Sequence, residues 1–142
     1  TSIIVGYPGE TEKDFQKLYD FVDEIKFDRL GVFTYSHEED THGYNTLKDN
    51  IPQQVKFDRM DAIMLLQQDI NLEKNKRLIG STEKVLIDLY TDDGFSIGRS
   101  YRDSPEVDNT VRIKDKLPIG KIMDIKITDA TEYELIGTSI SP

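Results

Sequence analysis

A glycine-rich turn follows the first apolar run of the chain and is the first candidate for chemistry. The run IIV at residues 3–5 leads directly into Gly-Tyr-Pro-Gly-Glu-Thr at residues 6–11. Glycines between a strand and a helix let the backbone approach a ligand, and the start of a helix attracts anionic groups. The same residues also fit a tight turn in which Thr11 only caps the helix. Both interpretations remain open from the sequence.

A second candidate lies at the end of a predicted strand in the C-terminal half. The string GRSYRD places Arg99 and Arg102 on either side of Tyr101. Arginine and tyrosine are residue types that anchor protein interfaces and stack on nucleic-acid bases. The alternative is that Arg99 simply pairs with a nearby carboxylate, such as Asp103 or Asp108.

The two histidines and a neighbouring serine form a weaker candidate. His37 and His42 have no third ligand close to them in the sequence, which disfavours a metal site. Ser36 lacks the strand-turn-helix context of a catalytic serine, which disfavours a hydrolase. The acidic run at residues 38–40 fits a solvated loop, so we expect neither kind of site here.

Cysteine is absent from the 142 residues. Its absence excludes disulfides, thiolate zinc sites and iron–sulfur ligation by this chain. The sequence has no apolar run of membrane-spanning length and no signal peptide, so we expect a cytoplasmic protein with no membrane partner. Because the chain starts with Thr1 directly on a strand pattern, we also expect it to be part of a longer protein.

The chain is acidic along its whole length. Its net charge is −9, with −5 from residues 1–78 (10 basic, 15 acidic) and −4 from residues 79–142 (8 basic, 12 acidic). Such a balance favours a basic protein surface as a partner and disfavours the phosphates of nucleic acid. A local basic patch can still override the net charge, so RNA is disfavoured without being excluded.

A long helix predicted from Pro52 to Gly80 separates two halves with different patterns. Pro52 suits a first helical turn, Gly80 suits a position just past the end, and neither Gly nor Pro lies between them. Apolar residues recur at helical spacing between them. At about 1.5 Å per residue the helix is roughly 40 Å long, so we expect it to belong to both halves. It is either an ordinary amphipathic core helix or a dedicated brace between two domains.

The N-terminal half has the pattern of a βαβ unit. The run at residues 3–5 predicts a strand covered on both faces, and Thr11 begins a helix whose apolar residues repeat to Ile25. Residues 27–35 predict a second strand. The polar stretch 36–50 predicts a loop at the carboxyl end of that strand, where α/β folds bind ligands. One such unit leaves strand faces bare, so it is not a whole domain.

The C-terminal half changes to short alternating strands. We expect strands near residues 85–89, 95–101, 111–113, 123–127 and 133–140, the second of them broken by Gly98. Five antiparallel strands of this length fit a small closed β-barrel, which removes exposed sheet edges. The expected fold is therefore α+β: a partial α/β unit with a long helix, followed by a five-stranded antiparallel barrel.

Several strings, taken together, resemble one known family. These are IIVGYPGET before a helix, FDRLGVFTYS, a helix ending in LEKNKRLIG, and GRSYRDSPEVDN. They resemble the C-terminal part of the radical S-adenosylmethionine methylthiotransferases, closest to the RimO type, over essentially the whole chain. The resemblance implies that residues 1–78 are the end of the radical enzyme's partial α/β barrel. It implies that residues 79–142 are a TRAM domain, a small OB-like barrel that holds the substrate.

The resemblance also implies cofactor-binding residues in the N-terminal half. The late-strand segment that supports S-adenosylmethionine would contain Ile4, Gly6 and Glu10. The following strand would face the same site through Val32 and Tyr35.

On the barrel, the resemblance implies a rim that is presented to the substrate. Its residues would be Arg99, Tyr101, Arg102 and Asp103. The chain departs from the usual family pattern at four positions, which are Tyr7, His37, Ser104 and Asn109.

The implied enzyme methylthiolates an aspartate of a small-subunit ribosomal protein near the decoding centre, using S-adenosylmethionine and two 4Fe–4S clusters. Cysteines hold those clusters in the family, so we expect this cysteine-free chain to bind no cofactor and to catalyse nothing by itself. We expect it to bind the ribosomal protein. One alternative is an RNA-binding TRAM module of a transfer-RNA methylthiotransferase, with a patch of Arg99, Arg102 and Lys114. The other is a segment with no independent binding.

Overall fold

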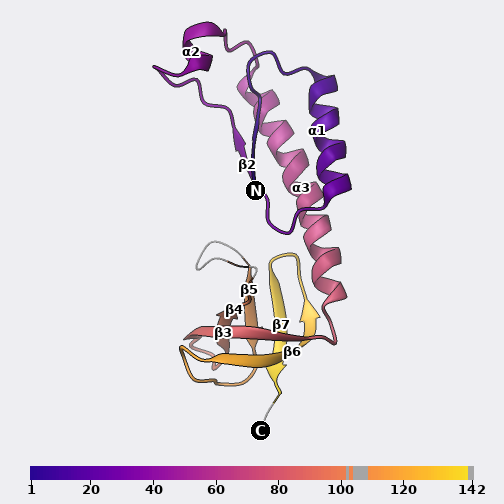
Figure 1. The fold of residues 1–142 in the computed structure, drawn as a ribbon, viewed down its shortest axis with the longest axis vertical. Coiled ribbons are helices and arrows are strands. Elements are labelled where there is room, and N and C mark those ends of the chain that lie inside the picture. The colour runs from indigo at the N-terminus through magenta and orange to yellow at the C-terminus, as the bar shows by residue number, and fades with distance from the viewer. Residues whose placement is uncertain (102, 104–108, 141–142) are drawn as a thin grey trace. The chain divides into compact units, whose positions relative to one another are not determined.

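The longest helix of the chain contains the division between its two units. The computed structural model describes residues 1–101, 103 and 109–140. Its two units are Thr1–Ile70 and Asn71–Pro142, so the division falls inside helix α3 (Gln53–Arg77). The α+β fold class predicted from the sequence is confirmed (Figure 1).

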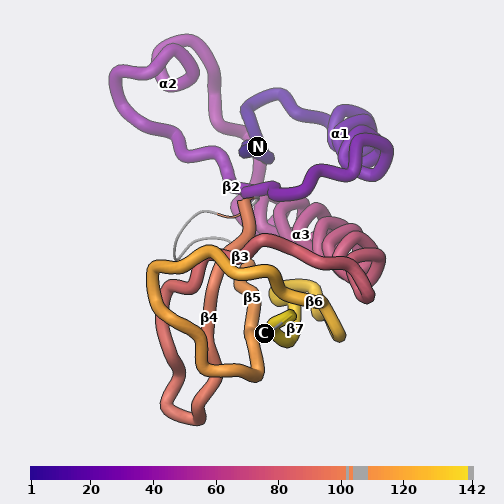
Figure 2. The backbone as a smooth tube through the Cα atoms, turned by 60° about the horizontal axis from the view of Figure 1, so that its bottom comes forward, coloured from indigo at the N-terminus to yellow at the C-terminus, as the bar shows by residue number. Residues whose placement is uncertain are grey.

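The first unit is the βαβ arrangement that the sequence predicts. Strands β1 (Ser2–Val5) and β2 (Gly31–Thr34) pair in parallel. Helix α1 (Glu12–Ile25) connects them, and it runs beside α3 in both views (Figure 1, Figure 2). Because the strands are parallel, their carboxyl ends lie at the same edge of the sheet.

Two features of the first unit differ from the prediction. Strand β2 begins at Gly31 and not at Phe27, because the Phe27 carbonyl accepts a hydrogen bond from the Gln67 side chain (2.7 Å) and not from a strand. The stretch predicted as a loop contains a short helix, α2 (His42–Thr46). Thr41 caps it by accepting the Tyr44 N–H.

A reciprocal cap begins α1. The Thr11 hydroxyl accepts the Asp14 N–H (3.1 Å), and the Asp14 carboxylate accepts the Thr11 N–H (3.0 Å). The two bonds satisfy backbone donors that have no partner inside the helix. They also lower the pKa of Asp14 below its ordinary value. Thr11 is therefore the helix cap that the sequence predicts.

The core of the first unit lies between one face of the sheet and the two long helices. Val22 of α1 and Ile63 and Ile70 of α3 are buried at its centre. Apolar side chains pack around them: Ile3, Phe15, Leu18, Tyr19, Phe27, Leu30, Val32 and Leu66. Burying each aliphatic side chain contributes roughly 1.5–3 kcal/mol, so α3 is held mainly by this face.

Helix α3 also supplies side chains to the second unit. Asn75 donates its side-chain N–H to the Thr131 carbonyl (2.8 Å), and Leu78 packs against the barrel core. Gly80, just past the end of α3, has a positive φ of 90°, and its N–H bonds to the Ile127 carbonyl (2.7 Å). Gly80 therefore begins the barrel, and α3 is shared by both units.

Five strands form the closed barrel of the second unit. They are β3 (Thr82–Tyr90), β4 (Ser96–Arg99), β5 (Thr110–Ile113), β6 (Ile122–Ala130) and β7 (Glu134–Ser139). Their order around the barrel is β3-β4-β5-β7-β6. The predicted barrel is present, but β5 and β7 pair in parallel. Along the chain, β6 comes between β5 and β7. The chain then enters β7 running in the same direction as β5.

Alternating side chains fill the barrel. Its buried residues include Val85, Ile87, Val111, Ile113, Ile125 and Ile127. The sequence predicted a strand broken by Gly98, and this prediction is wrong. Gly98 pairs with both Ile87 and Val111 inside the sheet, so β4 continues through it. A Cβ atom at this position would lie 2.5 Å from the Leu86 carbonyl oxygen. The missing side chain therefore allows the strands to approach as the barrel closes.

Candidate functional site

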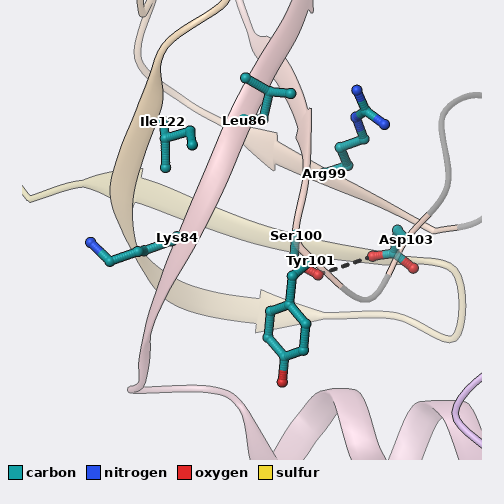
Figure 3. Close-up of a pocket in the computed structure, with 7 residues that line it drawn as sticks. All are labelled: Lys84, Leu86, Arg99, Ser100, Tyr101, Asp103 and Ile122. Carbon is teal, nitrogen blue, oxygen red and sulfur yellow. Dashed lines mark hydrogen bonds between the residues drawn. The ribbon is translucent and has the colours of Figure 1, made fainter.

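A hollow of about 500 Å³ opens on the outer surface of the barrel. Figure 3 shows its lining side chains: Lys84, Leu86, Arg99, Ser100, Tyr101, Asp103 and Ile122. They come from β3, from β4 and the residues after it, and from the start of β6. The structure thus brings together Arg99, Tyr101 and Asp103 of the predicted rim. The fourth predicted rim residue, Arg102, lies outside the described residues.

Strand alternation decides which side chains reach the hollow. Val85 and Ile87 are buried in the barrel core, so Leu86 between them points outward. Leu86 pairs with Ile122 on one neighbouring strand and with Arg99 on the other. The floor of the hollow is therefore an apolar pair, Leu86 and Ile122, with Arg99 beside it (Figure 3).

The two cations among the described lining residues are paired with carboxylates on neighbouring strands. The Arg99 Nε lies 3.3 Å from Asp88 Oδ2, and the Lys84 Nζ lies 3.0 Å from Asp124 Oδ1. The alternative that Arg99 pairs with a carboxylate is correct in kind, although its observed partner is Asp88.

The loop after β4 contributes a further carboxylate to the hollow. The Ser100 hydroxyl donates to Asp103 Oδ2 at 3.2 Å. This bond joins the end of the strand to the rim residue that follows it.

The sequence interpretation missed four lining residues, which are Lys84, Leu86, Ser100 and Ile122. A signal for two of them was present. Leu86 makes residues 85–87 a continuous apolar run, and Ile122 adds an outward apolar residue at the start of an alternating strand. Outward apolar residues on neighbouring strands indicate a surface that is not simply solvated.

A second group of polar side chains lies at the carboxyl ends of β1 and β2. Glu10 accepts the Gly6 N–H (2.7 Å) and an N–H from Arg59 (2.6 Å) through the same oxygen, Oε2. Arg59 also pairs with Glu12 at 2.8 Å, and its side chain is only 7% exposed. Burial lowers the pKa of the Arg59 guanidinium, but its hydrogen bonds to Glu12 and Glu10 raise the pKa by more than burial lowers it. The net shift of this pKa is therefore upward. Gly6 and Glu10 therefore hold the shape of the turn.

Lys56 joins the ends of both strands. Its ammonium group lies 2.8 Å from Asp49 Oδ2, 3.5 Å from the Tyr35 carbonyl and 5.2 Å from the centre of the Tyr35 ring. Its aliphatic stem crosses Gly6, where a Cβ atom would lie 2.3 Å from Lys56 Cγ. The hydrogen bond from Lys56 holds the pKa of Asp49 below its ordinary value.

Aromatic rings surround Tyr35. The Tyr7 ring meets it edge to face at 5.1 Å, and the His37 and Tyr44 rings are 4.9 Å apart. The Tyr35 hydroxyl lies 2.8 Å from His37 Nδ1. Desolvation raises the pKa of the Tyr35 phenol. His37, a departure from the usual family pattern, is therefore a hydrogen-bonding partner of Tyr35.

Ile4 and Val32 lie on opposite faces of the small sheet. Val32 pairs with Ile3 on the face that packs against the helices. Ile4 pairs with Phe33 on the other face, where the two side chains are 60% and 58% exposed. Of the five predicted cofactor residues, Gly6, Glu10 and Tyr35 belong to the polar group at the strand ends. Ile4 and Val32 lie on opposite faces of the sheet and are not part of this group.

Comparison with known proteins places the chain in a family. Residues 79–140 match the family described as TRAM domain. The chain is 51% identical over 140 residues to the ribosomal protein uS12 methylthiotransferase RimO of Cytophaga hutchinsonii, which covers 96% of this chain and 32% of that protein. It is 48% identical over 139 residues to the protein of that name from Clostridioides difficile, covering 96% of this chain and 31% of that protein.

A third relative of the same name, from Christiangramia forsetii, is 46% identical over 144 residues, covering 99% of this chain and 32% of that protein. The chain belongs to the RimO type of methylthiotransferase. It corresponds to the C-terminal part of this type, with the end of the radical S-adenosylmethionine barrel and a TRAM domain, as the sequence predicts. The chain spans about a third of the length of these relatives.

This RimO-type chain offers no cysteine donors for an iron–sulfur cluster. It has no cysteine, so its own thiolates cannot ligate iron. Among residues 1–101, 103 and 109–140, no three His, Asp or Glu side chains gather in a way that could hold a metal ion. In the same part of the chain, no helix is long and apolar enough to cross a membrane.

Proposed function

We propose that this RimO-type chain is the substrate-holding part of an enzyme that methylthiolates an aspartate of ribosomal protein uS12, near the decoding centre. The names of its relatives support the substrate and the reaction. In this proposal residues 1–78 complete the barrel of the radical enzyme, and residues 79–142 are the TRAM domain. The enzyme acts in the cytoplasm.

The observation that carries the proposal is the hollow on the acidic barrel. It joins Arg99, Tyr101 and Asp103 with an apolar floor, which is the residue mixture of a protein interface and not of a phosphate-binding surface. Residues 79–142 carry a net charge of −4, which favours a basic ribosomal protein over RNA. Arg102, next to Tyr101 in the sequence, is proposed to join the same rim.

The first unit is proposed to support the end of the S-adenosylmethionine site. The group of Gly6, Glu10 and Tyr35 lies where the parallel strands end, which is where α/β folds bind ligands. We include Ile4 and Val32 on the strength of the resemblance. S-adenosylmethionine and two iron–sulfur clusters supply the radical and sulfur chemistry of the whole enzyme. This chain fixes the strand ends and binds the protein substrate, and it is not catalytic alone.

A pair of binding titrations tests the proposal. The chain is titrated with ribosomal protein uS12 and, separately, with transfer RNA, each at low and at high salt. Binding of uS12 with little affinity for transfer RNA is the expected result.

The RNA-binding alternative predicts the opposite outcome. A patch of Arg99, Arg102 and Lys114 would give affinity for transfer RNA that falls steeply as salt rises, because bound phosphates release counterions. Such binding, without binding of uS12, would replace the proposed function with this alternative.

A further inference from the structure

The floor of the hollow is an exposed apolar surface framed by neutralised charges. Leu86 and Ile122 are cross-strand partners, and Ile122 is 68% exposed. On one side of them Lys84 pairs with Asp124, and on the other side Arg99 pairs with Asp88. An apolar cross-strand pair of this kind gains free energy only when another apolar group covers it.

The charges around the floor favour a basic partner. Asp103 lines the hollow, and its two described cations, Lys84 and Arg99, already have carboxylate partners in Asp124 and Asp88. Because these two cations are neutralised by their partners, the net charge of −4 carried by residues 79–142 sets the field at this surface. A phosphate backbone would be repelled, while a lysine or arginine of a partner would be attracted to the rim.

The size of the hollow limits what can fill it. About 500 Å³ lies within the range of roughly 300–1,000 Å³ that is typical of binding pockets. Leu86 and Ile122 form the apolar part of its lining, and Tyr101 is the one aromatic ring among the lining residues. A stacked run of bases needs successive aromatic faces, so the hollow suits a short piece of protein better.

We propose that the hollow receives an aliphatic side chain from an extended basic segment of the protein substrate. The aliphatic side chain covers Leu86 and Ile122, and lysine or arginine residues next to it in the partner lie against the carboxylates of the rim. This inference rests on the proposed function and adds to it the chemistry of the segment that is recognised. It assigns the central contact to Ile122 and Leu86, and gives Arg99 a supporting position.

A matched pair of isoleucine variants tests the inference with ribosomal protein uS12 as the probe. Ile122→Ser removes the apolar floor, whereas Ile119→Ser changes another exposed isoleucine of the barrel (53% exposed) that does not line the hollow. We expect Ile122→Ser to raise the Kd for uS12 about 10-fold or more, at low and high salt alike, because an apolar contact is not screened. Ile119→Ser should change it less than about 2-fold.

A conservative variant separates loss of the contact from loss of the fold. Ile122→Leu keeps an aliphatic group and should restore binding to within about 3-fold of the unchanged chain. Equal effects of Ile122→Ser and Ile119→Ser, or an Ile122→Ser effect that disappears at high salt, would overturn the apolar contact while leaving the proposed function in place. Absence of uS12 binding by the unchanged chain would overturn both.

Discussion

Arg59 Nη1 lies 2.6 Å from Glu10 Oε2, although the two residues are 49 positions apart in the sequence. The same oxygen accepts the Gly6 N–H, so one carboxylate ties α3 to the turn after β1. Both side chains are largely buried. Removing one member of a buried pair leaves the other charge without compensation.

Arg59→Met is therefore expected to destabilise the first unit by about 3 kcal/mol. The free energy of unfolding, followed by NMR signals of β1 and β2 in denaturant, measures the effect. Lys26→Met is the matched control, because Lys26 pairs with Asp23 at 3.6 Å on the exposed surface of the same unit. The control should cost less than about 0.5 kcal/mol. Similar losses of unfolding free energy in both variants would show that the buried pair stabilises the chain no more than an exposed pair does.

Gly6→Ala is expected to destabilise the first unit by about 3 kcal/mol. Its φ of 79° disfavours any side chain, and the new methyl group would collide with the Lys56 stem, which the bond to Asp49 keeps in place. Gly9→Ala has the same kind of backbone strain (φ 91°) but open space around the Cβ position. It should cost only about 1 kcal/mol. Equal losses of unfolding free energy in Gly6→Ala and Gly9→Ala would mean that the Lys56 side chain moves away from the new methyl group at little cost.

The bond between Lys56 and Asp49 predicts a dependence of stability on pH. Because the pKa of Asp49 is lowered in the folded chain, its stabilising contribution is complete above its unfolded pKa of about 3.9. The contribution is lost as the pH falls through the lower folded value. Unfolding free energies of the unchanged chain and of Asp49→Asn should therefore converge below about pH 4. A difference that stays constant from pH 2 to pH 6 would contradict the assignment.

Tyr101 is expected to be an anchor of the partner interface. Tyr101→Ala should weaken binding of uS12 by about 1–3 kcal/mol, as truncated aromatic anchors do, and Arg102→Ala should act in the same direction. Calorimetric titration measures both. Tyr133→Ala, at another exposed tyrosine of the barrel outside the hollow, should leave the affinity nearly unchanged. Unchanged affinity for Tyr101→Ala would move the interface to another face of the barrel.

Local sequence signals predicted much of the fold. Thr11 marked the start of α1 because its hydroxyl and Asp14 cap each other three residues apart. Alternation predicted the barrel strands, since Ile125 and Ile127 point inward from one strand. These features depend on neighbours in the sequence, which a pattern can detect.

Features that depend on distant partners could not be predicted in the same way. Lys56 and Arg59 looked like ordinary polar positions of a long helix, yet both are buried against carboxylates from other segments. Gly98 looked like a break in a strand. The Leu86 carbonyl that approaches it belongs to β3, so the local pattern around Gly98 could not reveal this contact. The parallel pairing of β5 with β7 likewise follows from the path of the whole barrel.

The most direct test of the account is amide hydrogen exchange of the 142-residue chain with and without ribosomal protein uS12. Bound uS12 should slow exchange around residues 84–86, 99–101 and 122, which line the hollow, and leave β1 and β2 unchanged. Protection confined to the first unit, or no protection at a concentration of uS12 that saturates binding, would contradict the claim that the barrel holds the substrate through this hollow.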